Sequence, residues 1–307
     1  MLYKSNRMKR IAFMILGCLF GTIPIFGQEM IANGLVADGA QLEEVGHGFA
    51  FTEGPAVDRD GNVYFTDQPN NRIWKYDITT DQLSVYMESA GRANGLFFDK
   101  NGNLIACADE KNELWRISGP THVDKLVKNY RDSLLNGPND VWVAPKGTIY
   151  FTDPYYQRDY WTRTSPDLHV QALYCYGKDE KLEQLDTDFI KPNGLVGTAD
   201  GKTLYVADIG ASNVYRYRIQ KDGALTEKTL FVTNQRTDGM TIDSDGRIYL
   251  AGNGITVYDT EGVQVAHIPV PAKWTANVCF AGKLRDMLFI TAGDKVFTLR
   301  MNTKGVK

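Results

Sequence analysis

The segment Asp60-Gly-Asn-Val-Tyr-Phe-Thr-Asp67 joins a tight-turn dipeptide to an alternating apolar strand, and the chain repeats this pattern. Similar segments cover residues 101–109, 146–153, 200–208 and 245–251, and a degenerate sixth copy covers 284–292. Asp-Gly and Asn-Gly between apolar runs are strong hairpin signals, because such turns need a positive φ. Steps of 41, 45, 54, 45 and 39 residues separate the reference positions Gly61, Gly102, Gly147, Gly201, Gly246 and Arg285.

A second strand rich in aromatic and β-branched residues follows most copies, as in Arg72-Ile-Trp-Lys-Tyr76. A period of about 40–50 residues with four short strands per unit is typical of a β-propeller. Stacked hairpins in a β-sandwich are the alternative, but a sandwich has no reason to keep a blade-length period. The sequence therefore predicts an all-β fold, a single six-bladed β-propeller domain over residues 28–307. We expect the blades at 48–90, 91–135, 136–190, 191–234, 235–273 and 274–302.

The last repeat ends soon after Leu299, so its blade lacks an outer strand. The segment Gln41-Leu-Glu-Glu-Val45 precedes the first blade and resembles the outer strands of other blades, such as Leu83-Ser-Val-Tyr-Met87. We therefore expect an N-terminal strand within residues 41–46 to pair with the last blade. This pairing closes the ring and removes an exposed sheet edge.

Six oxygen-bearing side chains stand eight residues before the six reference positions. They are Glu53, Asn94, Asn139, Asn193, Asp238 and Asn277. In a propeller the inner strands line a central channel, so residues in one register form a ring around its axis. Six converging oxygens are costly to bury unless something neutralises them.

A hard cation fits this ring, because calcium binds carboxylate and amide oxygens without thiolate or imidazole. Glu53 and Asp238 supply two negative charges to match its two positive charges. Magnesium is an alternative with stricter geometry. The other reading is that the Asn and Asp residues cap turns or bond the backbone where each strand begins. Turn capping alone does not require Glu at one position and Asp at another.

The same residues resemble those of a known family. Four segments, Phe51-Thr-Glu-Gly-Pro55, Asn136-Gly-Pro-Asn-Asp140, Lys191-Pro-Asn-Gly194 and Thr237-Asp-Gly239, are similar to those of the gluconolactonase, or regucalcin-like, six-bladed propellers. The resemblance covers roughly residues 41–300. It implies one divalent metal in the channel, usually calcium or zinc. It implies Glu53, Asn193 and Asp238 as direct ligands, with Asn139 as a fourth ligand or acting through water or substrate.

The sequence departs from that family at one position. The animal lactonases carry a substrate-holding Arg two residues before the Asn of the third blade, where this chain has Gly137. The particular lactone is therefore left open. The more distant diisopropyl fluorophosphatase shares the ligand set and hydrolyses phosphorus–fluorine bonds.

A metal with open positions can polarise a lactone carbonyl and bring a water alongside it. The cation also stabilises the tetrahedral oxyanion that attack produces. We assign Asp238 as the catalytic general base that takes the proton from water. The alternative is that Asp238 is only a ligand and a metal-activated hydroxide attacks directly. The sequence has no Gly-x-Ser-x-Gly elbow, and its four histidines show no ligand spacing.

The longest step between repeats contains an aromatic and basic insertion, Pro154 to Val170. Its residues Tyr155, Tyr156, Arg158, Tyr160, Trp161 and Arg163 suit a sugar ring and a carboxylate product. The alternative is a surface loop that covers the blade edge. We assign substrate binding to Asn94, Asn139, Asn277, Tyr155 and Tyr156.

Four aspartates end strands at one repeat position. They are Asp67, Asp109, Asp153 and Asp208. We expect them to form turn and blade-to-blade hydrogen bonds rather than to take part in catalysis.

Residues 1–27 carry four basic residues, no acid and a short apolar run, as in an export signal. This predicts an exported protein, periplasmic or secreted. Lipoprotein anchoring through Cys18 is the less favoured alternative, because apolar rather than polar residues follow it. The apolar run is too short and interrupted for a comfortable membrane span. Cys107, Cys175 and Cys279 remain, and we expect them to be small buried residues rather than a disulfide framework.

The composition is that of a globular protein, with 43% hydrophobic and 11% aromatic residues among 307. Removing residues 1–27 leaves 30 basic and 37 acidic residues, so the net charge falls from −3 to −7. Nucleic acid is thus an unfavourable partner. A small-molecule substrate fits best: a sugar lactone opened by a metal-dependent hydrolase. Another ester, such as a phosphotriester or a non-sugar lactone, is the second hypothesis, and a binding propeller with a structural metal is the third.

Overall fold

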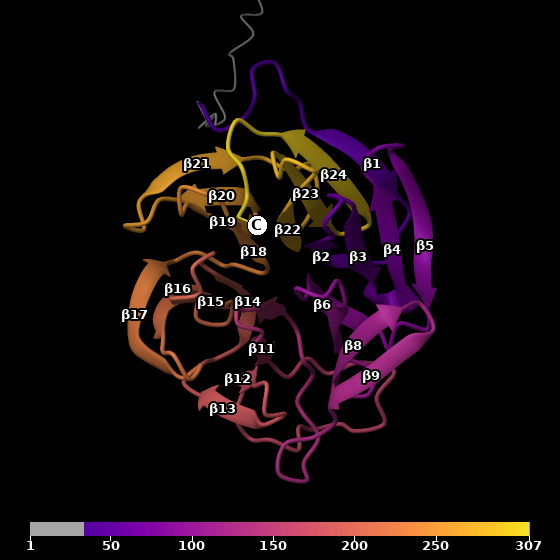
Figure 1. Cartoon of the computed structure of the whole chain (residues 1–307), viewed down its shortest axis with the longest axis vertical. Helices are drawn as coiled ribbons and strands as arrows, with labels where there is room; N and C mark the ends of the chain where they lie inside the picture. Colours follow the sequence, from indigo (N-terminus) through magenta and orange to yellow (C-terminus); the bar gives the residue numbers. More distant parts are fainter. Residues whose placement is uncertain (1–33, 307) are drawn as a thin grey trace, which may run out of the picture.

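The computed structural model describes residues 34–306, which form six four-stranded antiparallel sheets around a central channel. Figure 1 shows the sheets as the blades of a propeller, with first strands such as β2, β6 and β14 near the centre and fourth strands such as β5, β9 and β17 at the rim. The predicted six-bladed β-propeller is therefore confirmed.

Each of the first five blades uses four consecutive strands. Blades one to three contain β2 (Thr52–Val57), β3 (Val63–Asp67), β4 (Arg72–Asp77), β5 (Gln82–Glu88), β6 (Ala93–Phe98), β7 (Leu104–Ala108), β8 (Glu113–Gly119), β9 (His122–Val127), β10 (Val141–Val143), β11 (Ile149–Asp153), β12 (Ala172–Tyr176) and β13 (Leu182–Asp186). Blades four and five contain β14 (Pro192–Gly197), β15 (Thr203–Asp208), β16 (Asn213–Ile219), β17 (Leu225–Thr233), β18 (Met240–Ile242), β19 (Ile248–Gly252), β20 (Gly254–Tyr258) and β21 (Gln264–Ile268). One short 3₁₀ helix, η1 (Gln68–Asn70), follows β3.

The sixth blade takes strands from both ends of the sequence. It contains β22 (Asn277–Ala281), β23 (Met287–Ala292), β24 (Lys295–Arg300) and, on its outer side, β1 (Glu43–His47). Strand β1 runs antiparallel to β24, and the Lys295 Nζ lies 2.6 Å from the Glu44 Oε2. The closing N-terminal strand is thus confirmed, although it begins two residues later than Gln41.

The repeated turns have the geometry that their sequence requires. Gly61 has φ 92°, which a side chain rarely allows. The Asp58 Oδ1 accepts hydrogen bonds from the backbone N–H groups of Asp60 (3.0 Å) and Asn62 (2.9 Å). A short acidic side chain and a glycine therefore define the hairpin between the first two strands of the blade.

The hydrophobic core lies between neighbouring blades. Phe65 of the first blade and Phe289 of the sixth are completely buried, and their ring centroids are 5.5 Å apart. Burying one such side chain contributes about 1.5–3 kcal/mol. The cysteines Cys107, Cys175 and Cys279 are free and buried, as predicted. Packing between blades therefore fixes the positions of the inner strands around the channel.

The predicted export signal, residues 1–27 with Cys18, lies outside the described residues. Within the described part of the chain, no helix combines the length and apolar character needed to cross a membrane.

Candidate functional site

The six residues of the predicted ring lie where the inner strands begin. Glu53, Asn94 and Asn193 lie at the second position of β2, β6 and β14, Asn277 opens β22, and Asn139 and Asp238 stand two residues before β10 and β18. All six are buried, with at most 8% of any residue exposed. The common register therefore brings them to the same level of the channel.

A hydrogen bond joins each pair of neighbouring blades at this level. The six bonds are Thr66 Oγ1 to Asn94 O (3.0 Å), Gly95 N to Asn139 O (2.7 Å), Thr152 Oγ1 to Asn193 O (2.7 Å), Gly194 N to Asp238 O (2.8 Å), Gly239 N to Ala276 O (2.7 Å) and Asn277 Nδ2 to Glu53 Oε2 (3.3 Å). These bonds close a continuous circle. We call the six side chains Glu53, Asn94, Asn139, Asn193, Asp238 and Asn277 the polar ring.

Glycines make this close approach between blades possible. A Cβ at Gly54 would overlap the carbonyl oxygen of Asn94, and a Cβ at Gly239 would overlap the Asn277 side chain. Gly54 also has φ 45°, in the left-handed region. The glycine that follows most ring residues therefore allows the next blade to approach the axis.

Two carboxylates of the polar ring, Glu53 and Asp238, are buried near each other. Burial first, and then the charge of Asp238, raises the pKa of Glu53 well above its usual value. Burial also raises the pKa of Asp238 to about 6, against hydrogen bonds from Trp274 and Asn193 that lower it. The Glu53 Oε2 accepts a hydrogen bond from Gly54 N at 2.9 Å, and the Asp238 Oδ2 accepts one from Trp274 Nε1 at 2.5 Å. A bound cation would offset the cost of ionising both groups here.

Asp140 is a third buried acid that the sequence reading did not single out. Its Oδ1 accepts a hydrogen bond from Val141 N at 2.9 Å, and burial raises its pKa to about 7. Its charge also raises the pKa of Glu53. The signal lay in the position after each ring residue, which is occupied by Gly54, Gly95, Asp140, Gly194, Gly239 and Val278. Asp140 is the one acid in this series.

The predicted substrate-binding residues behave differently from one another. The Asn277 Oδ1 accepts a hydrogen bond from Val278 N (2.8 Å) while its Nδ2 donates to Glu53, so this residue orients Glu53. The Tyr156 hydroxyl accepts a hydrogen bond from the Asn193 Nδ2 at 3.1 Å. The Tyr155 hydroxyl instead donates to Gln157, and its ring packs beside Trp161. Tyr156 is therefore the loop tyrosine that contacts the polar ring.

The donor set of the ring suits a hard divalent cation. Glu53 and Asp238 offer carboxylate oxygens, and Asn139 and Asn193 offer amide oxygens, which are ligands that calcium prefers. Among residues 34–306, no group of three or more His, Cys, Asp or Glu side chains is arranged to hold a metal. A site rich in thiolate or imidazole is thus not what this ring provides.

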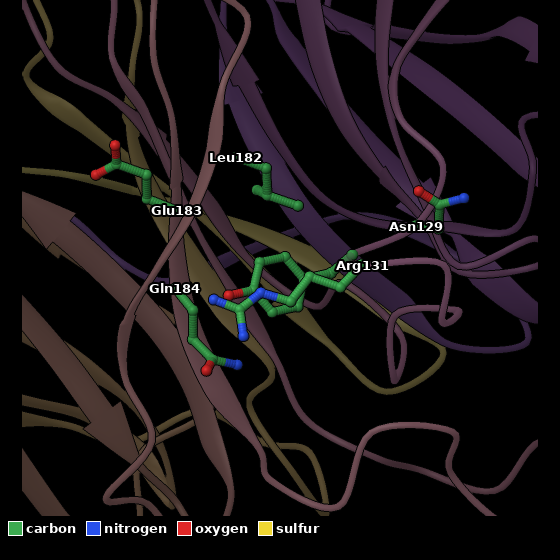
Figure 2. Close-up of a pocket in the computed structure, with 6 residues that line it drawn as sticks. Asn129, Arg131, Leu182, Glu183 and Gln184 are labelled. Carbon is green, nitrogen blue, oxygen red and sulfur yellow. The ribbon is translucent and has the colours of Figure 1, made fainter.

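Other hollows lie away from the polar ring. A pocket of about 460 Å³ beside strand β13, at the propeller rim, is lined by Asn129, Tyr130, Arg131, Leu182, Glu183 and Gln184. Figure 2 shows the labelled side chains around it. A second cavity, of about 310 Å³, is lined by later residues of the inner strands, such as Phe97, Trp142 and Ile242. Neither contains a ring residue.

Comparison with known proteins links this geometry to one family. The family model described as the SMP-30/Gluconolactonase/LRE-like region matches residues 35–294. The gluconolactonase of Zymomonas mobilis is 25% identical, with 94% of this chain and 88% of the relative covered. The diisopropyl-fluorophosphatase of Loligo vulgaris is 24% identical, with 78% and 84% covered.

Solved structures agree with the fold. The gluconolactonase XC5397 of Xanthomonas campestris superposes with a TM-score of 0.81 at 26% identity, covering 87% of this chain and 91% of the other. A calcium-binding protein, regucalcin from Agrobacterium tumefaciens, superposes with a TM-score of 0.74 at 20% identity, covering 87% and 95%. Its likeness shows the shared fold.

Proposed function

We propose that this chain, which belongs to the SMP-30/gluconolactonase/LRE-like family, is a metal-dependent lactonase, a carboxylic-ester hydrolase acting on sugar lactones. One observation carries the proposal. The buried carboxylates of Glu53 and Asp238 lie close enough for the charge of Asp238 to raise the pKa of Glu53, at a level of the inner strands that also carries Asn139 and Asn193, so that ionising both acids calls for a cation. The names of the relatives, gluconolactonase among them, agree with this activity.

Glu53, Asn139, Asn193 and Asp238 would hold the metal, with calcium as the preferred ion and zinc or magnesium as alternatives. A divalent cation in this ring would polarise the carbonyl of a bound lactone and stabilise the charge that develops on its oxygen. Asn277 orients Glu53 through its amide nitrogen. Asn94, Asn139 and Tyr156 would contact the substrate.

Asp238 would act as the general base. Its Oδ2 is held by the Trp274 indole at 2.5 Å, which fixes the direction of the carboxylate. Ionised Asp238 presents a carboxylate oxygen that can accept the proton of a water molecule as that water attacks the lactone. The proton then passes to the ring oxygen of the lactone as the C–O bond breaks, and an open-chain hydroxy acid leaves. The alternative role for Asp238 is that of a ligand only.

Proton release during lactone opening provides the test. Purified protein with calcium confirmed by elemental analysis would be offered five- and six-membered sugar lactones at constant pH. For at least one lactone, we expect the rate at which base must be added to hold the pH to be far above the rate of spontaneous hydrolysis. If the calcium-loaded protein opens none, the proposal is wrong.

The diisopropyl-fluorophosphatase relative supplies the second candidate, hydrolysis of a phosphorus ester at the same ring. Offering a fluorophosphate ester and a non-sugar lactone in the same assay decides between substrates. A protein that binds calcium but hydrolyses none of them would be a binding propeller with a structural metal. We also propose export by the N-terminal signal, which N-terminal sequencing of the secreted or periplasmic protein would test.

A further inference from the structure

Four aspartates occupy one repeat position at the end of the second strand, and three of them do the same thing. Asp67 accepts hydrogen bonds from Ala50 N and Phe51 N at 3.0 and 3.2 Å. Asp153 and Asp208 likewise accept pairs of backbone N–H groups 16 to 18 residues earlier, each at 2.8 Å. In these blades the carboxylate holds the turn that leads into the inner strand.

The Asp109 carboxylate does not hold the corresponding turn of the second blade. There the N–H of Arg92 donates instead to the Asn71 Oδ1, at 2.7 Å. The turn is built differently, since Gly91 and Arg92 both have positive φ, 64° and 47°. The carboxylate of Asp109 is therefore free for other partners.

Those partners come largely from the long insertion of the third blade. The Asp109 Oδ2 accepts hydrogen bonds from Arg158 Nε (2.7 Å), Tyr160 Oη (2.6 Å) and Gln68 Nε2 (3.0 Å). Its carbonyl oxygen accepts another from Trp161 Nε1 at 3.0 Å. The side chain of Asp109 is 2% exposed, so these donors meet it away from water. Charge-assisted hydrogen bonds in such surroundings are strong.

The backbone at Gly137 leaves room for the insertion to pack against Asp109. A Cβ at Gly137 would lie 2.6 Å from the Asp109 Oδ1 and 3.1 Å from the Trp161 ring, so only glycine leaves room for both. The Arg163 guanidinium lies 4.2 Å from the Trp161 ring centroid, and its Nη1 donates to the Leu135 carbonyl at 3.0 Å. Arg158 and Arg163 thus fasten the insertion at two points.

The fastened loop reaches the polar ring through Tyr156. The guanidinium of Arg158 lies 5.4 Å from the Tyr156 ring centroid, and the Lys191 Nζ lies 4.3 Å from it. The Tyr156 hydroxyl accepts the hydrogen bond from Asn193. A shift of Arg158 would therefore displace the aromatic ring of Tyr156, which lies beside the amide of Asn193 in the polar ring.

We propose that Asp109 is a positioning residue that fastens the loop 154–163 over the site, and so sets the affinity for the substrate without touching it. The kinetic part of this proposal rests on the proposed lactonase function. The fastening itself does not, because it concerns only contacts within the chain.

Trypsin cleavage of the native protein tests the fastening. In Asp109→Ala, we expect cleavage after Arg163 to rise at least about tenfold, the factor expected from losing charge-assisted hydrogen bonds. The substitution does not itself remove the contacts of Arg163 to carbonyl groups, so a rise in cleavage at this site shows that release has spread from Arg158 and Tyr160 to the second fastening point. Asp67→Ala is the matched control, because it removes a buried carboxylate at the same repeat position with no contact to the loop. It should leave cleavage at Arg163 unchanged.

Kinetics test the consequence. With a lactone that the wild-type protein opens, Asp109→Ala should raise KM about five- to tenfold and leave kcat within about twofold. If Asp109→Ala does not fold, the double variant Arg158→Met, Tyr160→Phe removes the same bonds from the loop side and should reproduce both effects.

Unchanged cleavage after Arg163 would overturn the proposal, and so would a released loop with unchanged KM. If the wild-type protein opens no lactone, the proposed function fails, while the cleavage result still decides whether Asp109 fastens the loop.

Discussion

The two ends of the channel are built from the same six inner strands but differ in chemistry. Where the strands begin, the polar ring brings buried acids and amides together. Further along the same strands, Phe97, Trp142, Val196, Ile242 and Phe280 line an apolar cavity of about 310 Å³. The C-terminal segment reaches this second end, where Val306 N donates to Ile242 O at 3.4 Å.

This difference separates function from packing along each strand. The fold needs apolar side chains somewhere on the inner strands, and it has them in their later residues. The first residues are then free to carry polar groups, whose burial a bound cation can offset. Substitutions at one end should therefore change metal binding and turnover, and substitutions at the other should change stability.

The largest expected effect comes from Glu53→Gln, which removes a charge from the ring and keeps its shape. We expect loss of bound calcium and a fall in turnover of at least about a thousandfold, since both depend on the same cation. Calorimetric titration and elemental analysis measure the first effect. Val196→Ala at the apolar end should keep full occupancy. Unchanged occupancy in Glu53→Gln would contradict a metal site at the ring.

Asp238→Asn should come next. If Asp238 is the general base, kcat falls about a hundredfold or more in saturating calcium, because proton abstraction loses its acceptor. Trp274→Phe is the control, since it removes the hydrogen bond that orients the carboxylate but keeps the carboxylate itself, and a smaller fall is expected. Full activity in metal-loaded Asp238→Asn would leave Asp238 as a ligand only.

Gly197→Ala probes the apolar end. A Cβ at Gly197 would overlap the rigid indole ring of Trp142, so the inner strands must shift. We expect the free energy of unfolding to fall by about 1–3 kcal/mol, as for other overpacked cores, with kcat/KM of the folded protein unchanged. Urea unfolding and lactone kinetics measure the two quantities. Loss of activity without loss of stability would show that the two ends are coupled.

The smallest effect is a pH dependence of the ring. The pKa values of Asp238, about 6, and Asp140, about 7, lie above their ordinary values, so the folded protein binds more protons than the unfolded chain. Stability of the metal-free protein should therefore fall as pH rises from about 4 to about 7. Calcium affinity should change in the opposite direction and be about tenfold weaker at pH 5 than at pH 8, since protons compete for Asp238. Titrations in both buffers test this, and a flat affinity would contradict it.

The sequence predicts the framework because its signals recur. Six turns, six strand starts and one register gave the blade number and the polar ring, and the unpaired last repeat gave the closing strand. The place of a repeated residue can be predicted because equivalent positions of neighbouring repeats lie side by side around the propeller axis. Glu53 and Asp238 can be identified from the sequence for this reason.

The remaining features depend on single residues that break the repeat. Asn277 has the expected register, yet its Oδ1 turns back to Val278 N and only its amide nitrogen reaches Glu53. Trp274 contacts Asp238 from the neighbouring blade without any periodic signal. Asp109 matches Asp67, Asp153 and Asp208 in sequence position, but its partners depend on how the chain enters the second blade. Side-chain direction at such positions follows from packing that a linear pattern does not contain.

The pairing of β1 with β24 has a consequence for how the molecule is made. Glu44 and Lys295 are 251 positions apart, so their contact closes nearly the longest loop in the fold. Closing so long a loop costs entropy, and distant contacts slow folding. As the chain is synthesised from its N-terminus, early blades can assemble one after another while the first strand waits for a partner. The ring of blades can therefore close only after its final strand has been synthesised. A chain cut short before residue 295 keeps an open sheet edge, which favours aggregation.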